Sequence, residues 1–228
     1  MSTGFGAAGA PHEVAPLLVA DQVYDVLAND IFTGRLPAGA RLRVREVAEQ
    51  VGTSVMPVRE AIRLLVKNGL AVSHPHRGAR VRRFTRSELI QIYDVRALLE
   101  LEATRLGAPH VTPADLEQMR GASERMYRAV VHGRVSEALD EDEVLLRLLY
   151  RAAGNEVLLS LIESLWVQCR PYKVIGARAA IQGKDASLWQ PQPALVDALR
   201  AGRLQLATEI NRESLAAARR RLEAEITS

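Results

Sequence analysis

Residues 45–83 read REVAEQVGTSVMPVREAIRLLVKNGLAVSHPHRGARVRR, and this stretch decides the fold of the first part of the chain. Apolar residues recur at helical spacing on both sides of Gly52, which predicts two short helices joined by a tight turn. Ser54 is placed to cap the second helix, and Asn68 with Gly69 closes it. Two helices joined in this way form a helix-turn-helix, whose second helix can lie in the major groove of DNA.

A small β-hairpin is expected directly after the second helix. Residues 70–73 and 79–83 can pair as strands around a turn at residues 74–78. A helix and a short extended piece are expected before the helix-turn-helix, within residues 17–44. The order of elements therefore predicts a winged helix-turn-helix domain over residues 16–83.

Positive charge gathers in the same region. Residues 35–83 contain 11 lysine and arginine residues against three glutamates, a net charge of +8, whereas the whole chain carries +3. On the second helix Ser54, Val55, Arg59 and Arg63 face away from the apolar stripe, and the two arginines lie one turn apart. Arginines so placed suit phosphate or guanine contacts, so double-stranded DNA is the expected partner of this surface.

The chain after residue 83 shows helical patterns almost to its end. Thr85-Arg86-Ser87-Glu88 is a capping-box pattern that opens a long helix. Two apolar stripes, in the first and fourth helices of this part, are expected to face inward. They are Leu89, Ile92, Val95, Leu98, Leu99 and Leu101, and then Val157, Leu158, Leu161, Ile162, Leu165 and Trp166. The predicted fold class is thus mainly α: residues 84–228 form a bundle of about six helices, and residues 1–15 a flexible tail.

Composition narrows the class of protein. Cys169 is the only cysteine, which excludes an intramolecular disulfide and fits a reducing cytoplasm. No apolar run reaches the length of a membrane span, and the first residues lack the order of a signal peptide. The sequence contains no nucleophile elbow, HExxH pair or glycine-rich phosphate loop, so it does not indicate an enzyme.

Several segments resemble a known family. PVREAIRLLVKNGL (57–70) and HRGARV (76–81) resemble the DNA-binding half of GntR-family bacterial transcription regulators. VRALLELEA (95–103), LLYRAAGN (148–155) and ALVDALRAGR (194–203) resemble the helical effector domain of the FCD subgroup. The DNA contacts that this resemblance implies are Arg45, Ser54, Val55, Met56 and Arg59, together with His76, Arg77 and Gly78 at the tip of the hairpin.

The chain departs from the family pattern at the start of its second helix. Relatives commonly have Ser-Arg-Thr where this chain has Ser54, Val55 and Met56. A bidentate arginine on guanine contributes about 1–3 kcal/mol of discrimination, whereas valine offers only apolar contact, for example with a thymine methyl group. We therefore expect an operator that differs from the usual family half-site.

A second departure concerns metal binding. Many FCD domains hold a divalent metal with one aspartate and three histidines; the aspartate position matches Asp142, but the histidine positions match Leu146, Gln192 and Ser214. This is a poor ligand set, so no tightly bound metal and no cofactor is expected. The resemblance instead implies an organic effector bound directly in a polar lining. That lining is Arg96, Asp142, Gln192 and Asn211, with a purely structural role as the open alternative for Arg96 and Asp142.

These observations predict a ligand-responsive transcription regulator, more often a repressor than an activator. A homodimer would bind a near-palindromic operator, and a small metabolite resembling an organic acid would modulate that binding. An architectural DNA-binding protein that ignores effectors is the alternative. A helical metalloenzyme with an accessory DNA-binding domain is a third possibility.

Overall fold

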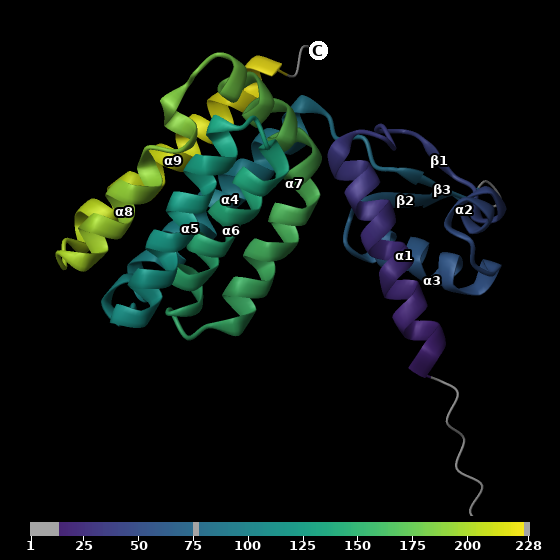
Figure 1. Ribbon diagram of the computed structural model, residues 1–228, viewed down its shortest axis with the longest axis horizontal. Helices are drawn as coiled ribbons and strands as arrows, with labels where there is room; N and C mark the ends of the chain where they lie inside the picture. Colours follow the sequence, from purple (N-terminus) through teal and green to yellow (C-terminus); the bar gives the residue numbers. More distant parts are fainter. Residues whose placement is uncertain (1–13, 75–77, 226–228) are drawn as a thin grey trace, which may run out of the picture. The chain divides into compact units, whose positions relative to one another are not determined.

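The computed structural model describes residues 14–74 and 78–225 and divides into two compact units at the junction between Arg83 and Phe84 (Figure 1). Most of the expected tail, and the wing-tip candidates His76 and Arg77, lie outside the described residues. Among the described residues, no helix combines the length and apolar character that crossing a bilayer requires.

The first unit is a winged helix-turn-helix, as predicted. Its elements are α1 (Val14–Thr33), β1 (Arg41–Leu42), α2 (Val44–Val51), α3 (Val55–Lys67), β2 (Ala71–His74) and β3 (Gly78–Val81). The strands form an antiparallel sheet in which β3 lies between β1 and β2. Helix α1 packs against α3, and the core between them contains Val23, Leu27, Val58 and Leu65.

Local signals set the ends of these helices. Gly52 follows α2 in the left-handed region, with a φ of 69°, which a residue with a Cβ rarely adopts. Ser54 is the residue before α3, as predicted, but its side chain makes no capping hydrogen bond. Helix α3 ends at Lys67, and the next side chain, Asn68, donates a hydrogen bond of 2.8 Å to the Tyr24 hydroxyl on α1.

The second unit contains six α-helices within the described residues, which agrees with the predicted bundle. They are α4 (Arg86–Gly107), α5 (Pro113–Val131), α6 (Val135–Arg151), α7 (Glu156–Gln182), α8 (Pro191–Arg200) and α9 (Leu204–Glu225). Thr85 and Glu88 form the predicted capping box at the start of α4. Helix α7 continues through Pro171 and ends at Gln182.

The predicted apolar stripes are only partly buried. On α4, Val95 is 44% and Leu98 73% exposed, and on α7, Val157 is 70% and Leu161 50% exposed. The buried face of α4 includes Leu89 from the predicted stripe, but its other members include Tyr93, Arg96, Glu100 and Ala103. The prediction was wrong here because helical periodicity was read from apolar residues alone, and the bundle buries an ion pair on the opposite side.

Candidate DNA-binding surface and effector cavity

The amino-terminal turn of α3 presents the predicted DNA contacts to solvent. Ser54 and Arg59 are exposed, Met56 is 63% exposed, and Val55 is half-buried. The first turn of a helix also carries backbone N–H groups without intrahelical partners, which favour phosphate. This turn therefore offers donors and apolar groups suited to a DNA groove.

Two of the predicted contacts, Arg45 on α2 and Arg59 on α3, have no acidic partner within the described part of the chain. Arg63, the third predicted contact, differs because its Nη1 lies 3.0 Å from Glu60 Oε1. Unpaired guanidinium groups interact with phosphate without first breaking an ion pair. Arg45 and Arg59 are thus the stronger candidates.

The wing is described only at its base. Gly78 is exposed and starts β3 with a φ of 76°, a value that favours glycine. Arg80 on β3 donates a hydrogen bond of 3.0 Å to the carbonyl of Gly39, and this fastens the wing to the loop before β1.

Glu100 is the centre of a buried polar network in the helical unit. Its carboxylate accepts hydrogen bonds from Arg96 Nε (2.6 Å), Trp166 Nε1 (3.0 Å) and the Tyr150 hydroxyl (2.9 Å). Burial opposes the charge of Arg96, but Glu100, with smaller contributions from Cys169 and Tyr93, more than offsets burial and raises the pKa of the guanidinium. Burial and Glu100 together raise the pKa of Tyr150. The network therefore keeps Arg96 charged and in place.

Asn211, an expected effector contact, belongs to the same network. Its side-chain nitrogen donates to Thr104 Oγ1 at 2.7 Å and to the Tyr150 hydroxyl at 2.9 Å. Asn211 also lines a cavity, so the network holds a residue of the cavity wall in place.

That cavity brings together all four positions matched to the family's metal ligands. Asp142, Leu146, Gln192 and Ser214 line it, although they come from α6, α8 and α9. Its volume is about 20 Å³. Both carboxylate oxygens of Asp142 accept hydrogen bonds, one from Gln192 Nε2 at 2.6 Å and the other from Lys173 Nζ at 3.0 Å.

The residues present do not fit a divalent metal. Within the described residues, no group of three or more His, Cys, Asp or Glu side chains is arranged to hold an ion. Lys173 also places an ammonium group on Asp142, and a metal would have to displace it. Burial opposes the charge of Lys173, but Asp142 and Glu143 outweigh it and raise the pKa of the ammonium.

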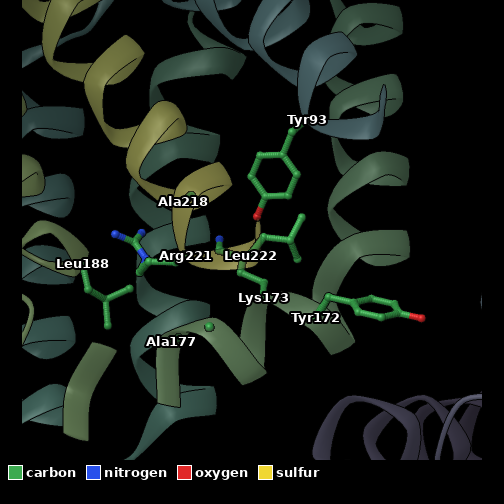
Figure 2. A pocket seen from close by; sticks show the side chains of 9 residues that line it. Tyr93, Tyr172, Lys173, Ala177, Leu188, Ala218, Arg221 and Leu222 are labelled. Carbon is green, nitrogen blue, oxygen red and sulfur yellow. The ribbon is translucent and has the colours of Figure 1, made fainter. Parts of the chain in front are cut away.

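A second cavity of about 10 Å³ adjoins the first and is shown in Figure 2. Lys173, Leu188, Ala218 and Arg221 line both cavities. Arg221 contacts Ser187 Oγ at 2.6 Å, and its nearest acid, Asp185, is 3.9 Å away. Burial lowers the pKa of Arg221. Two cations thus stand at the boundary of the cavities.

Among the residues that line the two cavities, two buried polar atoms have no hydrogen-bond partner within the described part of the chain: the Tyr93 hydroxyl and Gln192 Oε1. No expectation from the sequence included Tyr93, Lys173 or Arg221. A signal for Arg221 existed, since Asn211, Ser214 and Arg221 recur on one face of α9. The sequence holds no comparable signal for Lys173.

Comparison with known proteins matches each of the two units to a family of domains. The family model described as "Bacterial regulatory proteins, gntR family" matches residues 19–81, and the FCD domain model matches residues 91–217. The chain belongs to the GntR family and carries an FCD domain. The two matches fall in the two units that the structure separates.

Relatives of this GntR-family chain are transcriptional regulators and repressors. The "Probable D-xylose utilization operon transcriptional repressor" of Paenarthrobacter nicotinovorans is 36% identical over 189 residues, which cover 83% of this chain and 82% of the relative. The regulator McbR of Escherichia coli is 32% identical over 151 residues, covering 66% and 68% of the two chains. The solved structure of McbR superposes with a TM-score of 0.78 at 25% identity, over 90% of this chain and 97% of McbR.

Proposed function

We propose that this GntR-family protein is a ligand-responsive repressor that binds an operator through α3 and the wing. The observation that carries the proposal is the pair of unpaired arginines, Arg45 and Arg59, on the exposed side of the helix-turn-helix. The net charge of +8 over residues 35–83 supports binding to a polyanion. Repression is supported by the relative at 36% identity, which is named a transcriptional repressor.

A homodimer is proposed from the exposed apolar side chains of the helical unit. Val95 and Leu98 on α4 and Val157 and Leu161 on α7 are exposed, and the two helices pack against each other. Large exposed apolar groups on neighbouring helices mark protein interfaces. A two-fold dimer of this chain would present two copies of α3, so its operator would be near-palindromic.

An organic acid is the proposed effector. Lys173 and Arg221 would attract a carboxylate, and the Tyr93 hydroxyl and Gln192 Oε1 could pair with its other polar groups. Arg96, Asp142 and Asn211 complete the lining. Cavities of about 20 and 10 Å³ hold little more than a water molecule each, so binding would require the helices to move apart.

The small volume of both cavities is also the observation that favours the alternative, an architectural DNA-binding protein that ignores effectors. A titration separates the two functions. Acetate, pyruvate, succinate and citrate would each be added to the protein bound to its own promoter DNA. Release by any of these acids supports the regulator, and unchanged binding with a wide panel of metabolites supports the architectural protein.

The DNA-binding proposal is tested by Arg59→Ala. We expect the affinity for promoter DNA, measured by fluorescence anisotropy, to fall by about tenfold or more because a direct contact is lost. Arg105→Ala is the matched control, since Arg105 is an exposed arginine of the helical unit that pairs with Glu102. Equal affinities of Arg59→Ala and the wild type would remove α3 as the recognition helix.

A further inference from the structure

Tyr172 and Lys173 are consecutive residues of α7 whose side chains contact different parts of the helical unit. Lys173 lines both cavities and binds Asp142. Tyr172 lines the smaller cavity, but Figure 2 shows its hydroxyl at the far end of a ring that points away from the other labelled side chains. That hydroxyl accepts a hydrogen bond of 2.9 Å from the backbone N–H of Phe84.

Phe84 is the first residue of the helical unit and directly follows the junction at Arg83. It precedes Thr85, the N-cap of α4, so its N–H has no place in the hydrogen-bond ladder of that helix. The Phe84 and Tyr172 rings also meet edge to face, with centroids 6.0 Å apart. Tyr172 therefore holds the start of the helical unit by both a hydrogen bond and a ring contact.

The wall of the smaller cavity and the contact between Phe84 and Tyr172 belong to the same apolar cluster. Phe84, Tyr93, Cys169 and Leu222 are buried in one apolar cluster, and Tyr172 packs against it. Tyr93 and Leu222 also line the smaller cavity. A shift of α4, α7 or α9 that enlarges the cavity must therefore move residues that support Phe84.

Helix α7 is locally weakened just before these two residues. Pro171 has no N–H, so the carbonyl of Val167 receives no intrahelical hydrogen bond. Helices bend most readily at such a position. The turn of α7 that carries Tyr172 and Lys173 can therefore reorient with less loss of hydrogen bonding than an uninterrupted turn.

We propose that the Tyr172–Lys173 pair transmits effector binding from the cavity to the junction. An anion in the cavity draws the Lys173 ammonium away from Asp142, the turn after Pro171 shifts, and Tyr172 releases the N–H of Phe84. The inference rests on the proposed function, because it requires an effector in this cavity. Binding alters DNA affinity only to the extent that the effector favours the state in which Phe84 is released.

Hydrogen exchange tests the coupling without any effector. Lys173→Met removes the ammonium while nearly keeping the volume of the side chain, and Tyr172→Phe removes only the hydroxyl. In both variants we expect exchange in peptides spanning residues 80–92 to quicken by about two- to tenfold, the factor that one lost hydrogen bond permits. Exchange in peptides from α6 should stay unchanged.

Arg170→Met is the matched control, because Arg170 is a buried cation of α7 that pairs with Asp140 and Glu143 and lines neither cavity. Equal acceleration in Arg170→Met would show general loosening of α7 and overturn the proposal. Unchanged exchange near Phe84 in Lys173→Met would overturn it as well.

A second arm uses the acid, among acetate, pyruvate, succinate and citrate, that changes the operator affinity of the wild type. In Tyr172→Phe the N–H of Phe84 is already released, so this variant should bind the acid at least as tightly as the wild type, yet lose most of the induced change in operator affinity. A full response in Tyr172→Phe would overturn the coupling. If wild-type protein responds to no metabolite while the exchange results hold, the effector function fails and the internal coupling stands.

Discussion

Glu100 shows at the scale of one residue how this bundle depends on a buried charge. Its carboxylate is fully buried and joins Arg96, Tyr150 and Trp166. A buried ion pair is expensive to form, but removing one partner costs more, because the other charge remains without compensation. The network is therefore required for the stability of the helical unit.

We predict that Glu100→Gln lowers the free energy of unfolding by about 3–5 kcal/mol, because Arg96 would stay buried without its counter-charge. Urea denaturation followed by circular dichroism measures the change. Glu102→Gln provides the control: Glu102 is exposed and pairs with exposed Arg105, so its loss should cost far less than the loss of Glu100. Similar costs for the two variants would contradict the importance assigned to the network.

Gly107 decides, at the scale of elements, how closely α4 approaches α6. A Cβ at this position would lie 2.2 Å from the backbone carbonyl oxygen of Leu149, a distance that real Cβ atoms do not reach. Gly107 is therefore needed for close packing of the two helices, since a rigid backbone atom faces it.

The prediction for this contact is that Gly107→Ala lowers the stability by about 1–3 kcal/mol, because α4 and α6 must move apart. Gly121→Ala is a control within α5: its Cβ would meet only the end of the Arg125 side chain, at 3.2 Å. Alanine there should stabilise the helix by about 0.5–1 kcal/mol. Thermal unfolding of both variants gives the comparison, and an unaltered midpoint for Gly107→Ala would refute the packing argument.

At the scale of the whole molecule, the exposed apolar side chains of α4 and α7 are proposed to form the dimer contact. These side chains are Val95, Leu98, Val157 and Leu161. Leu98→Glu should raise the dimer dissociation constant by about 100-fold or more, because each dimer would bury two carboxylates among apolar side chains. Light scattering after gel filtration measures the mass at several concentrations. Tyr127→Glu, at an exposed apolar residue of α5, should leave the mass unchanged. A stable dimer of Leu98→Glu would exclude this surface.

The sequence correctly predicted the winged helix-turn-helix, the helical bundle and the capping box at Thr85, because the signals for these features are local. A glycine with positive φ, a capping box and a run of apolar residues each act over a few positions. The same reasoning misplaced Val95 and Leu98, because a helix with apolar residues on two sides does not reveal which side the other helices cover.

The amino-acid sequence by itself determined the order of elements, the cationic character of the first unit and the loss of the histidines expected around Asp142. Only the tertiary structure decided three contacts. Lys173 donates a hydrogen bond to Asp142, Arg221 lines the same cavity as Lys173, and the Tyr172 hydroxyl accepts a hydrogen bond from Phe84, the first residue after the junction. The physical reason is separation along the chain. Asp142 and Lys173 lie 31 residues apart and Phe84 and Tyr172 lie 88 apart, so helix packing brings them together and no local pattern encodes the meeting.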